Sequence, residues 1–192
     1  EDELTPAVRD KDVHRAFNLM AANIPPGCDN LIFTPWLNGE RSPVDDSNIR
    51  SGFHNMSLRT TRAHMVRSVF EGVAFNAKWL LKYIEKLIKK KMTVINIIGG
   101  GAKSDLWCQI HADIMNRTIR RVKEPIQANA RGAGLLGSVA LGYIKFNEIP
   151  GKTEFDSIFT PNPKNRTLYK KLFKQYQAIY KQNKKIHKRL NK

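Results

Sequence analysis

The segment "TVINIIGGGAKSDLWCQIHADIM", residues 93–115, constrains the fold more than any other part of the chain. An apolar run rich in β-branched residues ends in three consecutive glycines, and Ser104 then begins a stretch with helical periodicity as its expected N-cap. The continuous apolar run predicts a strand covered on both faces. A strand, a glycine turn and a helix in this order predict an α/β fold.

The glycine turn itself suggests a ligand. Glycine has no Cβ and allows positive φ, so a ligand can lie directly against its backbone. The free N–H groups of the following helical turn carry partial positive charge and favour a phosphate or a nucleotide. The turn does not match GxxxxGK[ST], and "GGGAKS" does not match GxGxxG. A second interpretation therefore stays open, in which the glycines serve only a tight strand-to-helix turn.

Other segments alternate between helical and extended patterns. Strands are expected in 31–37, 93–99 and 118–122, and 38–55 is expected to form a long loop. Helices are expected in 11–24, 60–90, 104–115 and 128–146, and in the segment after Pro163. The helix in 128–146 contains several glycines, which predicts close packing at Gly137 and Gly142. Gly132 and Ala133, at its start, could instead face a ligand.

The composition is that of an ordinary globular chain with an uneven charge distribution. The 192 residues suffice for a single domain with a substantial core, and no apolar run approaches the roughly 18 residues of a membrane span. Cys28 and Cys108 are far apart and form no CxxC motif, which favours a reducing, cytoplasmic setting without disulfides. The first residue is not Met, so we expect a fragment of a longer protein.

The basic C-terminal segment, about 163–192, carries much of the net charge of +16. It contains eleven of the 33 Lys and Arg residues and no Asp or Glu. Apolar side chains nevertheless recur through it at helical spacing, at Leu168, Leu172, Tyr176, Ile179, Tyr180 and Ile186. This pattern favours a packed helix with a solvated basic face over a nucleic-acid-binding arm.

Three ordered motifs together resemble the C-terminal half of the FGGY family of carbohydrate kinases. They are "FTPWLNGERSP", the block "SGFHNMSLRTTRAHMVRSVFEGVAF", and "IIGGGAKSDLWCQIHADIMNRTIR". The resemblance covers about Leu31 to Tyr143. Asn55 replaces the usual glycine of the second block, and asparagine also tolerates left-handed backbone. "WLNGERSP" is more similar to the xylulose kinase branch than to the glycerol kinase branch.

This resemblance implies an actin-like ATPase (ribonuclease H-like) domain, a mixed sheet flanked by helices, spanning 1–192. ATP, with Mg²⁺, would bind in a cleft between two domains. Gly99, Gly100, Gly101 and Ala102 would form the nucleotide turn, and Ser104 would lie near the adenosine. The family's N-terminal domain supplies the sugar site and the aspartate base, and none of its motifs occurs here. We therefore expect no catalytic residue in this chain and little activity from it alone.

The leading hypothesis is the ATP-binding half of a kinase for xylulose or a related pentulose. Two alternatives stay open: a noncatalytic nucleotide- or nucleic-acid-binding module that uses the basic helix, and a structural remnant with an empty glycine turn. We expect no membrane or nucleic-acid partner, and a homodimer stays open. Asp45 and Asp46 are expected to be solvated, Glu71 to anchor a hydrogen-bond network, and Trp107 to belong to the core. Cys108 and His111 alone do not make a zinc site.

Overall fold

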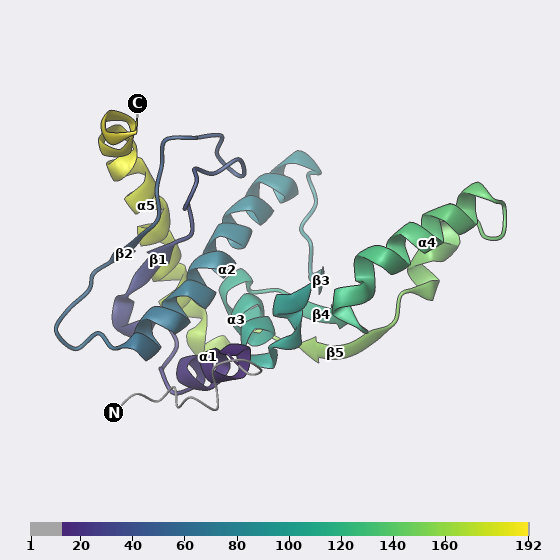
Figure 1. Ribbon diagram of the computed structural model, residues 1–192, viewed down its shortest axis with the longest axis horizontal. Coiled ribbons are helices and arrows are strands. Elements are labelled where there is room, and N and C mark those ends of the chain that lie inside the picture. The colour runs from purple at the N-terminus through teal and green to yellow at the C-terminus, as the bar shows by residue number, and fades with distance from the viewer. Residues whose placement is uncertain (1–12, 192) are drawn as a thin grey trace.

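The computed structural model describes residues 13–191, and its helices and strands alternate along the chain (Figure 1). The α-helices are α1 Val13–Ala22, α2 Arg62–Leu87, α3 Asp105–Met115, α4 Ala128–Ala140 and α5 Arg166–Leu190. The strands are β1 Ile32–Thr34, β2 Gly52–His54, β3 Val94–Ile97, β4 Thr118–Val122 and β5 Phe155–Phe159. Short 3₁₀ turns connect them: η2 Cys28–Asn30, η3 Gly100–Lys103, η4 Pro125–Gln127, η5 Phe146–Lys152 and η6 Pro163–Asn165.

The larger sheet is mixed, as expected. Strand β3 pairs in parallel with β4, and β4 pairs antiparallel with β5, with Ile119 opposite Phe159. Strands β1 and β2 form a separate antiparallel pair. Strand β2 lies inside the segment expected to be a loop, and β5 was not expected at all. The sequence of β5, "FDSIF", contains two polar residues, so strand propensity alone gives a weak signal. Its pairing with β4 contributes more to the formation of this strand.

The expectation that β3 is covered on both faces is wrong for this chain. Ile95 and Ile97 pack with Leu81 and Ile119 beneath α2 and α3. On the opposite side Val94 is 38% exposed, and Asn96 is exposed as well. The apolar run therefore has only one buried face among the described residues.

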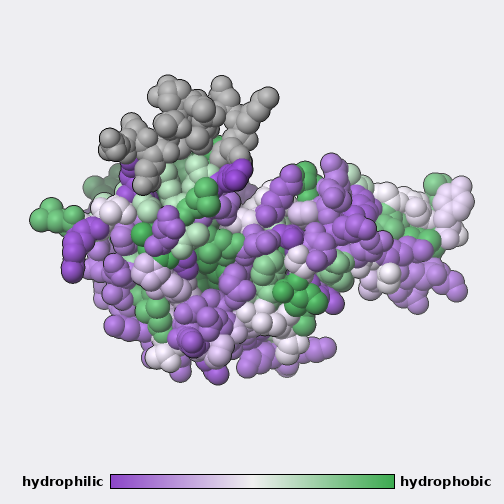
Figure 2. Space-filling model, turned by 90° about the horizontal axis from the view of Figure 1, so that it is seen from below, coloured by the Kyte–Doolittle hydropathy of each residue, from purple (hydrophilic) through white to green (hydrophobic). Residues whose placement is uncertain are grey.

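Helix α4 and the turn η5 form an arm that projects from the body of the molecule (Figure 1). No residue of α4 is buried, and Leu136 and Leu141 are 55% and 72% exposed. A Cβ added at Gly137 or Gly142 would meet nothing within 4 Å. The close packing expected for these glycines is thus not made by residues 13–191, and hydrophobic atoms are visible on the surface of the arm (Figure 2).

Helices α2 and α5 form the core together with β1. Tyr169, Leu172, Phe173, Tyr176 and Tyr180 of α5 are all buried. This confirms the prediction of a packed terminal helix with a basic outer face. Strand β1 lies close against α2 because Gly72 has no Cβ, which would otherwise collide with the carbonyl oxygen of Phe33.

A buried ion pair in α2 connects four parts of the fold. Arg67 Nε donates to Glu71 Oε1 at 2.9 Å, and Arg67 Nη1 donates to the carbonyl of Ala21 at the end of α1 at 3.1 Å. Glu71 Oε1 also accepts from the backbone N–H of Gly27 at 3.0 Å and from the hydroxyl of Tyr169 in α5 at 2.8 Å. The prediction that Glu71 anchors a hydrogen-bond network is confirmed.

A second network fixes the loop "NGERSP". Glu40 Oε2 accepts from Asn76 of α2 at 2.7 Å, and Asn76 Oδ1 accepts from Trp36 and Tyr176 at 3.2 and 3.0 Å. Asp46 is only 8% exposed and accepts from the hydroxyl of Tyr180 at 3.2 Å, so its expected solvation is wrong. The loop is long but anchored through its carboxylates.

Two further features bear on the setting of the protein. Cys28 and Cys108 are both free and buried. None of the helices in the described range combines the length and apolar character that a bilayer crossing requires.

Replacing Tyr169 by Phe should destabilise the fold. The change removes one of three donors to a buried carboxylate oxygen, which should lower the free energy of unfolding by about 1.5–3 kcal/mol. Tyr143→Phe is the matched control because Tyr143 is 78% exposed, and it should change stability by less than about 0.5 kcal/mol. Urea unfolding followed by circular dichroism measures both, and equal effects would contradict a structural role for the network.

His111 should make stability pH-dependent. Burial lowers its pKa from 6.5 to about 4, so the folded chain holds the neutral imidazole. Between pH 6.5 and pH 4 the imidazole is protonated in the unfolded chain but not in the folded chain. The contribution of the neutral His111 to the free energy of unfolding is therefore fully present above pH 6.5 and is lost as pH falls toward 4. Wild type should lose about 2 kcal/mol more than His111→Gln between pH 7 and pH 5. The exposed His14→Gln serves as the control, and an unchanged slope in His111→Gln would refute the assignment.

Candidate functional site

The three glycines of the turn differ in what the structure requires of them. Gly99 has a φ of 88°, a backbone conformation that residues with a side chain rarely adopt. Gly101 faces the indole ring of Trp107, with which a Cβ would collide. Gly100 has neither constraint, because a Cβ there would meet nothing within 4 Å. Its bare backbone therefore faces open space.

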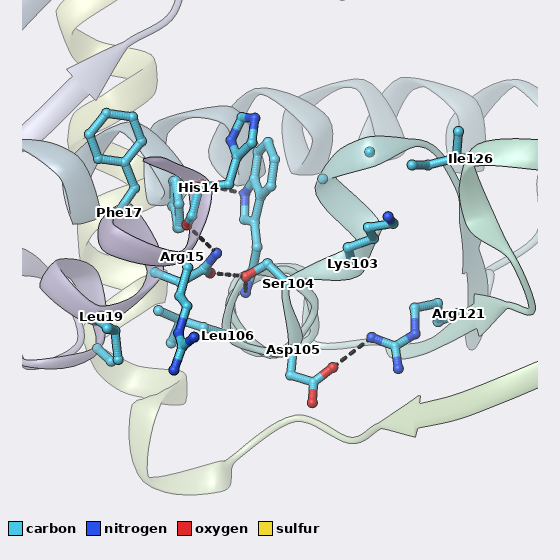
Figure 3. A pocket seen from close by; sticks show the side chains of 16 residues that line it. His14, Arg15, Phe17, Leu19, Lys103, Ser104, Asp105, Leu106, Arg121 and Ile126 are labelled. Carbon is cyan, nitrogen blue, oxygen red and sulfur yellow. Dashed lines mark hydrogen bonds and ion pairs between the residues drawn. The ribbon is translucent and has the colours of Figure 1, made fainter. Parts of the chain in front are cut away.

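The turn is held rigidly on both sides. The Gly99 N–H donates to the carbonyl of Pro125 at 2.8 Å, and the Ser104 N–H donates to that of Gly101 at 3.1 Å. Ser104 is the N-cap of α3, as expected, and its Oγ accepts from the N–H of Trp107 at 3.0 Å. The same Oγ donates to Asn18 of α1, which connects the first helix to the turn (Figure 3).

A pocket of about 900 Å³ lies between α1 and the turn. Helix α1, η3, the first turn of α3, β4 and η4 all contribute to its walls (Figure 3). One part of the lining is apolar and consists of Phe17, Leu19, Ala22, Phe70, Leu106, Trp107 and Ile126. Such a mixture of apolar and polar side chains is typical of small-molecule sites.

The charged side chains that line the pocket are predominantly cationic. They include Arg15, Lys103 and Arg121, and Ser104 lies between Arg15 and Lys103 in the view of Figure 3. Arg121 donates to Asp156 and to Asp105, each at 2.6 Å, and these hydrogen bonds raise the pKa of its guanidinium. Asp105 is the one carboxylate among the lining residues of the described chain, and Arg121 holds it in place.

The predicted site residues divide between the lining and its support. Gly100, Gly101 and Ser104 line the pocket. Gly99 and Ala102 do not line the pocket. Gly99 sets the backbone conformation at the start of the turn, and Ala102 is buried, with its carbonyl accepting a hydrogen bond from Cys108 Sγ at 3.4 Å. Both residues support the turn from outside the pocket lining.

Sequence reasoning missed the whole contribution of α1. Its lining residues precede the glycine turn by about eighty positions, and their helical pattern carries no sign of a ligand. Arg121, Phe70 and Ile126 were missed for the same reason, because tertiary packing alone brings them to the turn.

Trp107 combines two roles. It stacks on Phe70 with ring centroids 5.1 Å apart, and its Nε1 donates to the Phe70 carbonyl at 3.1 Å. This confirms the expected packing against the core, although the residue also lines the pocket. Within residues 13–191 no three His, Cys, Asp or Glu side chains gather as a metal site would require.

Comparison with known proteins agrees with this geometry. Residues 3–141 match the C-terminal domain of the FGGY family of carbohydrate kinases. The xylulose kinase of Staphylococcus epidermidis is 37% identical over 169 residues, which cover 87% of this chain and 34% of that protein. The chain thus spans about a third of the length of the curated relatives it matches.

Solved structures of sugar kinases share the fold. A gluconate kinase from Lactobacillus acidophilus superposes with a TM-score of 0.82 at 32% identity, over 97% of this chain and 38% of that one. A ligand-bound xylulose kinase from the same organism gives a TM-score of 0.78 at 35% identity, over 92% of this chain and 37% of that one. The actin-like ATPase fold expected from the sequence is confirmed. By its motifs, its matched domain and its fold, the chain belongs to the FGGY family of carbohydrate kinases.

Proposed function

We propose that this chain forms the ATP-binding part of a kinase that phosphorylates a small sugar, with xylulose or a related pentulose as the expected substrate. The observation that carries the proposal is the open backbone of Gly100 at the entry to α3, beside a pocket of about 900 Å³. Such an arrangement suits a nucleotide, because its phosphates can approach a main chain that carries no Cβ at the N-terminus of a helix.

The pocket lining offers both kinds of contact that ATP needs. Apolar side chains such as Leu106 and Ile126 can contact the adenine, and Arg15 and Lys103 can contact the phosphates. Ser104 and Asn18 would fix the position of α1 against the turn, because their hydrogen bond joins the two. The proposed site residues are therefore Gly99, Gly100, Gly101, Ala102 and Ser104, supported by α1.

The described residues place one carboxylate, Asp105, in the lining of this pocket. Asp105 is paired with Arg121 at 2.6 Å, so it is held as a counter-ion and not as a base for the sugar hydroxyl. When bound, ATP with Mg²⁺ supplies the γ-phosphoryl group for in-line transfer, and positioning supplies most of the catalysis. We assign the positioning of the nucleotide to this chain. The relatives are about three times as long, and we place the base and the sugar site on a part that corresponds to their additional length.

The surface of the chain fits an assembly with further polypeptide. The arm of α4 and η5 exposes Leu141, Tyr143 and Phe146 by 69–78%, and β3 leaves one face uncovered. We propose that the remaining part of the kinase packs on these surfaces. The basic helix α5 buries its apolar side in the core, which leaves a nucleic-acid-binding role without a specific observation in its favour.

Gly100→Ala should weaken ATP binding while leaving the fold intact. The added methyl group enters open space at the turn and excludes a phosphate, so affinity should fall about tenfold or more. Gly134→Ala is the matched control, because its Cβ also meets nothing within 4 Å but lies in α4, outside the pocket. Isothermal titration with ATP and Mg²⁺ measures both variants and the wild type.

The possible outcomes separate the proposal from its alternative. Loss of binding in Gly100→Ala alone supports a nucleotide turn. Equal affinity in all three proteins, or no detectable binding by wild type at millimolar ATP, would favour a turn that needs glycine only for its geometry.

The isolated chain should show no significant kinase turnover. ADP release with xylulose, and in parallel with gluconate, should stay at the level of the sample without sugar, because Asp105, the carboxylate that the described residues place in the pocket, is held by Arg121. A turnover near the typical range of about 1–100 s⁻¹ would contradict the assignment of base and sugar site to another part of the kinase.

A further inference from the structure

A second, smaller pocket lies at the other end of α3 from the glycine turn. It has a volume of about 250 Å³ and is lined by the C-terminal half of α2, the end of α3, the link from α3 to β4 and the first turns of α5. Helix α3 has eleven residues, so the two pockets are separated by roughly 16 Å along its axis. None of the expected nucleotide-site residues lines this second pocket.

Cations from two helices face this pocket as matched pairs. Lys78 and Lys82 are four residues apart on α2, and Arg166 and Lys170 are four residues apart on α5. Like charges at this spacing repel each other within each helix. Arg166 and Lys170 also lie in the first turns of a long helix, where the helix dipole adds positive potential.

Lys78 is the most constrained of these cations. It is largely removed from solvent, and its ammonium donates to the carbonyl of Ile114 at 2.5 Å and lies 4.8 Å from the ring centroid of Phe173. Neither partner carries a full negative charge. Burial, with Arg117 and Lys82 nearby, lowers its pKa from 10.5 to about 8.

The two carboxylates of the pocket already have hydrogen-bond or ion-pair partners, and one of these partners, Arg117, lines the pocket itself. Glu85 binds Arg117 at 2.8 Å and accepts from the N–H of Met92 at 2.9 Å. Asp113 accepts from Gln109, from the N–H of Asn162 and from Asn165, at 2.7–2.8 Å. Six Lys and Arg residues thus line the pocket against two acids, a local excess of four positive charges when all are ionised.

We propose that this pocket binds a phosphoryl-bearing small molecule, either inorganic phosphate or a phosphate monoester, held between Lys78 and Lys82 of α2 and Arg166 and Lys170 of α5. An arginine supplies paired donors for the phosphate oxygens, and lysines supply point charges around them. The pocket volume suits one phosphate with a short organic substituent. The ligand would connect α2 to α5 and would relieve the repulsion within each pair.

The test compares two double variants of the whole chain that remove the same charge from the same helix. Arg166→Gln with Lys170→Gln removes two cations that line the pocket, and Lys171→Gln with Lys174→Gln removes two exposed cations outside it. Inorganic phosphate and ribose 5-phosphate are titrated separately at constant ionic strength, and amide shifts in two-dimensional NMR report on binding.

We expect the pocket variant to bind both probes about tenfold more weakly than wild type, and the control variant to bind as wild type does. Tighter binding of ribose 5-phosphate than of phosphate identifies a monoester site, and equal binding identifies the free anion as the ligand. Equal weakening in both variants would overturn the proposal, because it would show attraction to net charge alone.

Lys78 provides a measurement that does not require a variant. A bound dianion stabilises its ammonium form, so its pKa should rise from about 8 when phosphate saturates the pocket. The carbon shift of its ε-methylene group, followed against pH, measures this change. If the pKa of Lys78 stays the same at saturating phosphate, the anion binds elsewhere. This outcome is independent of whether ATP binds at the glycine turn, at the other end of α3.

Discussion

The buried carboxylate of Glu71 is the constraint on which the rest of the structure depends. One oxygen accepts hydrogen bonds from α2 itself, from the turn after α1 and from α5, so three chain segments share one negative charge. Arg67 compensates that charge and ties down the end of α1. A buried carboxylate without such partners would be strongly destabilising. Helix α1 carries much of the pocket lining, so the position of this wall follows from an interaction within the core.

The glycine turn shows how one short sequence satisfies structural and ligand requirements together. Gly99 serves the backbone conformation and Gly101 serves the packing of Trp107, whereas Gly100 lines the pocket and has neither constraint. The two interpretations of the turn are therefore not exclusive. Two of the three glycines would be needed with no ligand at all, and the third carries the functional argument.

Sequence patterns were sufficient where the determinants are local. The capped helix after Ser104 and the packed basic helix were predicted, because capping and periodicity specify them. The anchoring role of Glu71 was predicted from its position between apolar neighbours, although its distant partners Gly27 and Tyr169 were not. Sequence patterns failed where contacts between distant segments are decisive. Strand β5 depends on its pairing with β4, and Asp46 is buried where it binds the hydroxyl of Tyr180. Helix α1 contacts the glycine turn through Asn18. The expected burial of β3 on both faces was wrong for a related reason, since an apolar run does not show whether another segment packs on its second face.

The position of Trp107 gives the chain an optical reporter of its own. Its indole touches Gly101, stacks on Phe70 and lines the large pocket. The other two tryptophans, Trp36 and Trp79, are only 1% and 4% exposed, deep among the aromatic rings of α2 and α5. Any quenching or spectral shift of the fluorescence on adding a small molecule would therefore arise chiefly from the one indole beside the glycine turn, and occupancy could be followed in the unlabelled protein.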